Sequence, residues 1–165
     1  MLGLSVALVR VKTDRARVQA EIRSGIYEFV QGTPLPGVQV RDSTGRFSPL
    51  TDICDGHTPV VVMITQEHCE ACEQIAPLWH ALASHRRDSR FVLIYTYGVP
   101  ARELAAPYSN VSLRSTLPGL LGTIAHIHAA PAAIAVDKQC HIIAAGSGPS
   151  ASRAVLEQLP APDVH

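Results

Sequence analysis

A run of apolar residues followed by two closely spaced cysteines is the feature that most constrains how this chain can fold. After Pro59, the six residues Val60–Thr65 are all apolar or β-branched, which is typical of a strand buried on both faces of a sheet. Cys69 and Cys72 follow almost at once. Beyond them an amphipathic helix is predicted, because apolar residues recur with helical spacing at Ile75, Leu78, Trp79 and Leu82. The sequence therefore predicts a buried strand, a Cys-x-x-Cys pair and a helix, in that order.

This arrangement is suited to dithiol redox chemistry. At the start of a helix, Cys69 lies beside unpaired N–H groups and the positive end of the helix dipole, which favour its thiolate. In such motifs the pKa of a thiol can fall from about 8.5 to roughly 3.5–7.5. Cys72, one helical turn later, is placed to attack a mixed disulfide on Cys69 and release the product. His68 would add a nearby cation, whereas Glu70 and Glu73 would oppose the thiolate, so the net effect on the pKa of Cys69 stays open.

Length and charge limit the other possibilities. A chain of 165 residues supports one domain with its own core, with room for an appendage. Its formal net charge is zero, so the basic surface of a nucleic-acid-binding protein is not expected. The apolar run Leu2–Val9 is far shorter than the roughly 20 residues that cross a bilayer. We interpret the chain as soluble or loosely membrane-associated, with the end of a truncated anchor as the alternative.

The remaining pattern predicts further helices and strands on either side of the cysteines. A helix over 12–30 is read as a solvated tether or juxtamembrane segment, and Pro77 is expected to bend the helix after the cysteines without ending it. The last helix is expected to be capped by Ser150. The other predicted elements are a hairpin over 38–48, a helical turn over 50–56, strands at 91–95 and 111–113, helices at 101–106 and 116–121, a hairpin formed by 132–136 and 140–145, and the last helix at 151–159. Together they predict an α/β fold, a mixed sheet flanked by helices.

These features resemble the thioredoxin fold, and within it the membrane-tethered bacterial branch of TlpA-type disulfide reductases and the methylamine-utilisation proteins known as MauD. The resemblance covers residues 32–160. The residues that carry it are the segment Gly32-Thr-Pro-Leu-Pro-Gly before the hairpin, the strand leading into Cys69-Glu-Ala-Cys72, Pro77, Ala130-Pro131 before a strand, Asp137 in the closing hairpin and Gly146 after it.

The resemblance implies a fold, an activity and a place of action. The fold would be a thioredoxin-like mixed sheet with an N-terminal β-hairpin extension, spanning 32–165, with a helical tether at 1–31. The chain would be a thiol–disulfide oxidoreductase that exchanges disulfides with a protein substrate and with an upstream redox donor or acceptor, outside the cytoplasm. It would help a cysteine-rich partner mature or reduce misformed bonds. No cofactor is expected, because the electrons travel on the sulfurs.

The same resemblance assigns a substrate-binding loop. Ala130-Pro131 would contain the family's cis-proline, packed against the two cysteines and offering backbone groups to an incoming peptide, with His68 beside it. Two positions depart from the family. His68 stands where many relatives have an aromatic residue, and Ile75 stands where many TlpA-type relatives have Glu. The second departure favours the methylamine-utilisation type and leaves the general base unidentified; His126 and His128 are candidates.

Zinc binding is an alternative use of the cysteines. Cys54 and His57 precede the central strand, and Cys69 and Cys72 follow it, so four residues have finger-like spacing. A strand over Pro59–Thr65 would hold the two pairs about 20 Å apart. Zinc–sulfur bonds of about 2.3 Å cannot bridge that distance. Redox chemistry is therefore preferred, and no metal is expected.

Two further alternatives share the same fold. A thiol peroxidase would use a lone cysteine in a Thr-x-x-Cys setting, but Gln66 stands three residues before Cys69. A redox-inert interaction module would usually lack one of the two cysteines. Cys54 and Cys140 are most simply interpreted as small buried apolar residues, and a disulfide between them, or an electron relay through either, is the less favoured alternative.

Overall fold

The computed structural model of the chain describes residues 29–96, 108–116 and 130–159. The helix expected over 12–30 falls almost entirely outside these ranges. The helix expected at 101–106, nearly all of the one expected at 116–121, and the candidate bases His126 and His128 also lie outside the described residues.

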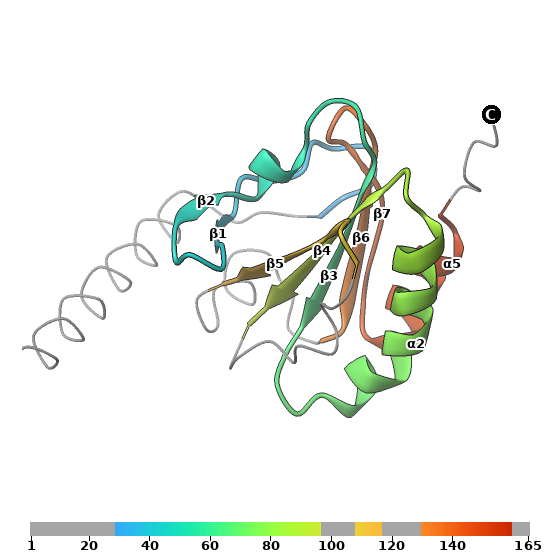
Figure 1. Cartoon of the computed structure of the whole chain (residues 1–165). Coiled ribbons are helices and arrows are strands. Elements are labelled where there is room, and N and C mark those ends of the chain that lie inside the picture. The colour runs from blue at the N-terminus through green and yellow to red at the C-terminus, as the bar shows by residue number, and fades with distance from the viewer. Residues whose placement is uncertain (1–28, 97–107, 117–129, 160–165) are drawn as a thin grey trace, which may run out of the picture.

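A single mixed sheet of seven strands forms the centre of the described part of the chain, in the order β2-β1-β5-β4-β3-β6-β7. The strands β3, β4 and β5 are parallel, whereas β6 runs antiparallel to β3 and β7 antiparallel to β6 (Figure 1). The bounds are β1 Gln39–Arg41, β2 Phe47–Pro49, β3 Val60–Thr65, β4 Arg90–Tyr95, β5 Val111–Ser115, β6 Ala132–Val136 and β7 Ile142–Ser147.

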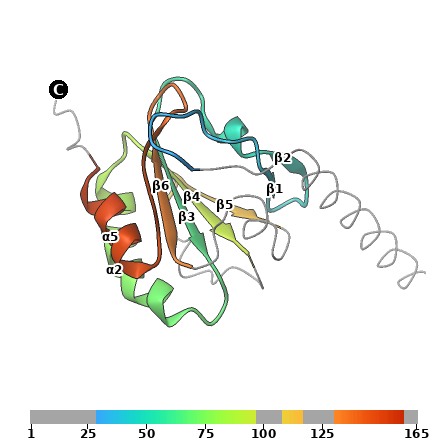
Figure 2. The same cartoon turned by 180° about the vertical axis from the view of Figure 1, so that it is seen from behind.

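The central strand β3 is buried on both faces, as its sequence predicts. The helices α2 (Glu70–His85) and α5 (Pro149–Glu157) lie on one side of the sheet (Figures 1 and 2). Val61 and Met63 belong to the core beneath these helices, where the Trp79 ring meets Phe91 edge-on at 5.1 Å between ring centroids. The other face of β3 belongs to a second core that also contains Leu35, Val38, Val40 and Leu50, from the N-terminal hairpin region and the short 3-10 helix η1 (Leu50–Ile53).

The helix after the cysteines matches the prediction in position and differs in its buried face. Pro77 lies inside α2 and the helix continues past it to His85. Ile75 and Trp79 are fully buried, together with Cys72 and Ala83. The predicted stripe members Leu78 and Leu82 are only partly buried at the edge of the same core.

Several predicted boundaries differ from the structure: the strand predicted at 111–113 is Val111–Ser115, the helical turn predicted over 50–56 is Leu50–Ile53, and the last helix ends at Glu157. The strand β7 begins at Ile142, because Cys140 has a positive φ of 66° and belongs to the turn before the strand. The last helix begins at Pro149, and its N-cap is Gly148 with φ 86°, so Ser150 is not the cap.

Among the described residues, no helix has the length and apolar character needed to cross a membrane.

Candidate functional site

Cys69 occupies the junction between β3 and α2. It is the N-cap residue of the helix, with extended backbone angles of φ −102° and ψ 93°. Its carbonyl oxygen accepts hydrogen bonds from the backbone N–H groups of Cys72 and Glu73, at 2.9 and 3.1 Å. Its sulfur also accepts from the Cys72 N–H, at 3.1 Å. The helix N-terminus is therefore in direct contact with the sulfur that the sequence assigns as the nucleophile.

Cys69 and Cys72 are bonded to each other. The two sulfurs are 2.10 Å apart and the two Cα atoms 5.2 Å apart. Cys69 retains 8% of its surface accessible and Cys72 only 3%. Both cysteines are thus buried, and Cys69 is slightly the more exposed of the two.

The bond between Ala130 and Pro131 is cis, as the resemblance implies. Ala132 pairs with Ile64 in the antiparallel ladder between β6 and β3. Pro131 therefore lies at the end of the sheet where β3 finishes, and the chain passes from there to Cys69. Figures 1 and 2 show the start of β6 and the start of α2 at the same end of the molecule. The fold brings the proline loop and the two cysteines to one edge.

Ser152 holds the proline loop in place, and the sequence reasoning missed it. Its hydroxyl donates to the carbonyl oxygen of Pro131 at 2.9 Å, and the N–H of Gly148 donates to the same oxygen at 2.8 Å. Ser152 is completely buried on the face of α5 that also carries Val155 and Leu156. A serine on an otherwise apolar helix stripe is the signal that could have identified it.

The surface beside Cys69 carries carboxylates. Glu70 and Glu73 are exposed in the first turn of α2, and within the described ranges neither forms an ion pair. His68 has a positive φ of 55°, and its side chain is 91% exposed and 3.8 Å from Glu67. His68 is thus placed on the rim of the site rather than against the sulfurs.

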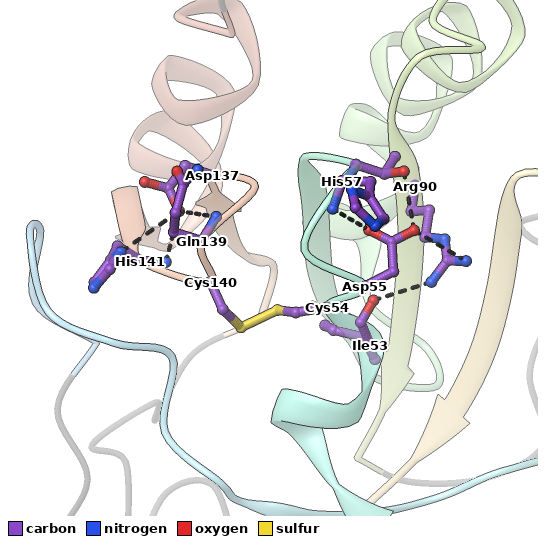
Figure 3. Close-up of a disulfide and its surroundings, with 10 residues drawn as sticks. Ile53, Cys54, Asp55, His57, Arg90, Asp137, Gln139, Cys140 and His141 are labelled. Atoms are coloured by element: carbon purple, nitrogen blue, oxygen red, sulfur yellow. Dashed lines mark hydrogen bonds and ion pairs between the residues drawn. A yellow bond between two sulfur atoms is a disulfide. The ribbon is translucent and has the colours of Figure 1, made fainter.

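Cys54 and Cys140 form a second disulfide, so the preferred interpretation of both as unpaired buried residues is wrong. Their sulfurs are 1.98 Å apart across a sequence separation of 86 residues. The bond joins the loop after η1 to the turn between β6 and β7 (Figure 3). It lies at the end of the sheet opposite to Cys69, because Val60 at the start of β3 pairs with Val136 at the end of β6.

The four residues of the zinc alternative are not brought together. Cys54 and His57 precede β3 at one end of the sheet, while Cys69 and Cys72 follow it at the other. Each of the three cysteine sulfurs is also engaged in a disulfide. Across residues 29–96, 108–116 and 130–159, no group of three or more His, Cys, Asp or Glu side chains is placed to hold a metal ion.

Comparisons with known proteins identify the fold. No family model and no curated relative matches the sequence. Solved structures do match. A Chlorobium tepidum protein assigned as the thiol:disulfide interchange protein DsbE has a TM-score of 0.62 and 16% identity, over 79% of this chain and 96% of its own. A thio-disulfide isomerase from Thermus thermophilus has a TM-score of 0.58 and 20% identity, over 79% and 94%.

A third match is a secreted disulfide oxidoreductase from Mycobacterium tuberculosis, with a TM-score of 0.56 and 16% identity over 73% of this chain and 92% of its own. At these identities the likeness concerns the fold. The described part of the chain has a thioredoxin-like fold, with a mixed sheet and flanking helices as the sequence predicts.

Proposed function

We propose that this protein is a thiol–disulfide oxidoreductase whose reactive group is the Cys69–Cys72 pair. The observation that carries the proposal is the disulfide itself, closed at the N-terminus of α2 with the Cys72 N–H on the Cys69 sulfur. Two cysteines bonded at this junction favour dithiol exchange over thiol peroxidase chemistry, which would use a lone cysteine.

The reaction transfers two electrons between dithiol and disulfide. In the reducing direction, the Cys69 thiolate attacks one sulfur of a substrate disulfide. A Cys69–substrate disulfide forms, and the other substrate sulfur leaves as a thiolate. Cys72, deprotonated, then attacks Cys69 Sγ, which closes the Cys69–Cys72 disulfide and releases the second substrate thiolate. Oxidation of a substrate dithiol is the same sequence in reverse.

The cis-proline loop is proposed to bind the substrate. The carbonyl oxygen of Pro131 already accepts hydrogen bonds from Ser152 and Gly148. The backbone of Ala130, one residue earlier and half-buried, is then the nearest part of the loop that can pair with an extended peptide. His68 would contact the substrate from the rim. The substrate is a protein thiol or disulfide, and a separate redox protein would regenerate the pair.

The second disulfide supports a place of action outside the cytoplasm. Disulfides persist in secreted and periplasmic proteins and are rare where thiols are kept reduced. Cys54–Cys140 lies far from the reactive pair, so the catalytic cycle does not account for it. We propose an extracytoplasmic domain over 32–165, tethered through 1–31, that helps a cysteine-rich partner to mature. Ile75, fully buried where many TlpA-type relatives carry Glu, favours the methylamine-utilisation type.

Equilibration in glutathione buffers and an insulin-reduction assay test the proposal. The Cys69–Cys72 couple should titrate with a potential between about −270 and −120 mV, the span of known dithiols of this kind. Cys69→Ser should abolish insulin reduction, and Cys72→Ser should trap a mixed disulfide. The Cys54→Ser/Cys140→Ser double variant is the matched control and should remain active. Unchanged activity in both single variants would refute the proposal, and an inactive wild type would favour a redox-inert module.

A further inference from the structure

Ser152 lies on the buried face of α5 with Val155 and Leu156, and its side chain is completely buried. Its hydroxyl is within hydrogen-bond distance of two carbonyl oxygens, that of Pro131 at 2.9 Å and that of Gly146 at 3.3 Å. A hydroxyl has a single proton to donate, and the shorter distance is nearer to the usual length of an O–H···O bond. Pro131 is therefore the preferred acceptor.

The carbonyl oxygen of Pro131 is held by two donors. The N–H of Gly148 donates to it at 2.8 Å, and the Ser152 hydroxyl is the second donor. The N–H of Ser152 in turn donates to the carbonyl oxygen of Gly148 at 2.9 Å. These three bonds join the proline loop to the start of α5, and they occupy both lone pairs of the Pro131 oxygen.

A serine at position 152 has a cost that an alanine would not have. Removing a hydroxyl from water is unfavourable unless it finds a hydrogen-bond partner, and the other buried residues of α5, Val155 and Leu156, are apolar. The partner that Ser152 finds belongs to the loop with the cis Ala130–Pro131 bond. What the hydroxyl fixes is therefore the proline loop.

We propose that Ser152 is a positioning residue that makes the site prefer polypeptide disulfides to small disulfides. The inference rests on the proposed function, in which the backbone of Ala130 pairs with an extended peptide. A loop that is already held in place loses less entropy when a peptide pairs with it. A small disulfide without peptide groups cannot pair with Ala130 in this way, so it gains nothing from the held loop.

Single-turnover oxidation of the reduced Cys69–Cys72 pair by two disulfides tests the proposal. Insulin is the polypeptide disulfide, and hydroxyethyl disulfide is the small one, which has no peptide groups. Ser152→Ala should lower the ratio of the insulin rate constant to the hydroxyethyl disulfide rate constant by about fivefold, as expected for the loss of one hydrogen bond. The loss should appear as a higher insulin concentration at half-maximal rate, with a smaller change in the maximal rate.

Ser150→Ala is the matched control, because Ser150 is an exposed serine in the same first turn of α5, and it should keep the wild-type ratio. Equal slowing of both reactions in Ser152→Ala would overturn the proposal, because it would show a general structural role. A wild-type protein that reacts with neither disulfide would instead refute the proposed function.

A measurement on the wild type decides the question should Ser152→Ala fail to fold. The S-methylated B chain of insulin, which cannot exchange disulfides, is added to the oxidised protein and followed by NMR. The amide of Ala130 should shift saturably, while the Ser152 hydroxyl proton stays protected from exchange with water. No saturation at Ala130 would contradict the proposal. Rapid exchange of the hydroxyl proton in the complex would do the same, because it would show that the bond to Pro131 breaks on binding.

Discussion

Two carboxylates, Glu70 and Glu73, lie in the first turn of α2, directly after the proposed nucleophile Cys69. The Cys72 N–H and the helix N-terminus favour a thiolate at Cys69, while Glu70 and Glu73 in the first turn oppose it. Since disulfide reduction is easier when the thiolate is stabilised, these acids should lower the reduction potential. The helix N-terminus and the two carboxylates act on the same sulfur in opposite directions. Substituting the carboxylates leaves the helix in place, so their effect on the reduction potential can be measured on its own.

We predict that Glu70→Gln/Glu73→Gln raises the potential of the Cys69–Cys72 couple by about 10–40 mV. This range follows from roughly 0.3–1 kcal/mol for each charge near a helix N-terminus and 30 mV for each 1.4 kcal/mol. Glutathione equilibration measures the shift, and it should shrink at high salt. Glu157→Gln, at the far end of α5, is the control and should leave the potential unchanged. A lower potential in the double variant would contradict the argument.

Asp55 organises the loop beside the second disulfide. The N–H of His57 is the main cause that lowers the pKa of Asp55 from 3.8 to about 2, followed by the N–H of Thr58. These bonds are 2.8 and 2.7 Å long, and Arg90 adds an ion pair at 3.4 Å. The folded protein thus favours the ionised carboxylate more than the unfolded chain does.

We therefore predict that Asp55 contributes to acid sensitivity. A group whose pKa falls on folding stabilises the protein above its unfolded pKa, near 3.8, and this contribution is lost as the pH falls toward about 2. Asp55→Asn should lower stability at neutral pH and should flatten the dependence of the urea midpoint on pH over this window. Glu157→Gln serves as the comparison. An equally steep pH profile in Asp55→Asn would show that the carboxylate is not responsible.

At the scale of the elements, the packing of β7 against α5 depends on one glycine. A Cβ added to Gly146 would lie 2.7 Å from the carbonyl oxygen of Ala151, a backbone atom that cannot move alone. The start of α5 carries Ser152, whose hydroxyl holds Pro131. A shift between β7 and α5 would therefore reach the proposed substrate loop.

Gly146→Ala should lower the free energy of unfolding by about 1–3 kcal/mol, the usual cost of overpacking, and should slow insulin reduction. Urea unfolding and the activity assay measure the two effects. Gly37→Ala is the matched control, because its nearest contact would be Pro49 Cβ at 3.8 Å, and it should be nearly neutral. A stable and fully active Gly146→Ala variant would mean that α5 can shift without moving the proline loop.

The local features of the site were predictable because each depends on neighbours in the sequence. Both faces of β3 are buried, so its residues form an unbroken apolar run. The cysteine spacing places Cys69 and Cys72 one turn apart, and Pro77 is compatible with the continuing helix. The N-cap of the last helix is Gly148 rather than the predicted Ser150, because the turn into the helix needs a positive φ, here 86°, which glycine adopts readily. The preference of serine for N-cap positions does not reveal this backbone requirement.

At the scale of the whole molecule, what escaped prediction depends on contacts between distant segments. Cys54 and Cys140 are 86 residues apart. They meet only because β3 and β6 are adjacent and antiparallel, with Val60 opposite Val136. The Ser152 contact to Pro131 likewise needs α5 to pack beside β6. Four cysteines allow three pairings, and spacing identified only one of the two bonds.

The two disulfides lie at opposite ends of the sheet. Cys69–Cys72 is the proposed reactive bond, and we predict that Cys54–Cys140 has a bracing role, which is to stabilise the fold. Cys54–Cys140 closes a loop of about 86 residues and so restricts the unfolded chain. Its removal should raise the conformational entropy of the unfolded chain and thereby lower the stability of the fold. Cys54→Ser/Cys140→Ser should lower the free energy of unfolding by about 2–5 kcal/mol, measured by urea unfolding of the oxidised proteins.

The same double variant should keep the potential of the Cys69–Cys72 couple, because the two bonds lie at opposite ends of β3. Cys69→Ser/Cys72→Ser is the matched comparison: it removes a bond that closes only a three-residue separation, for which the entropic model expects much less stabilisation. Equal losses of stability in the two double variants would contradict a bracing role for Cys54–Cys140. A changed potential would instead show that the two ends are coupled through the sheet.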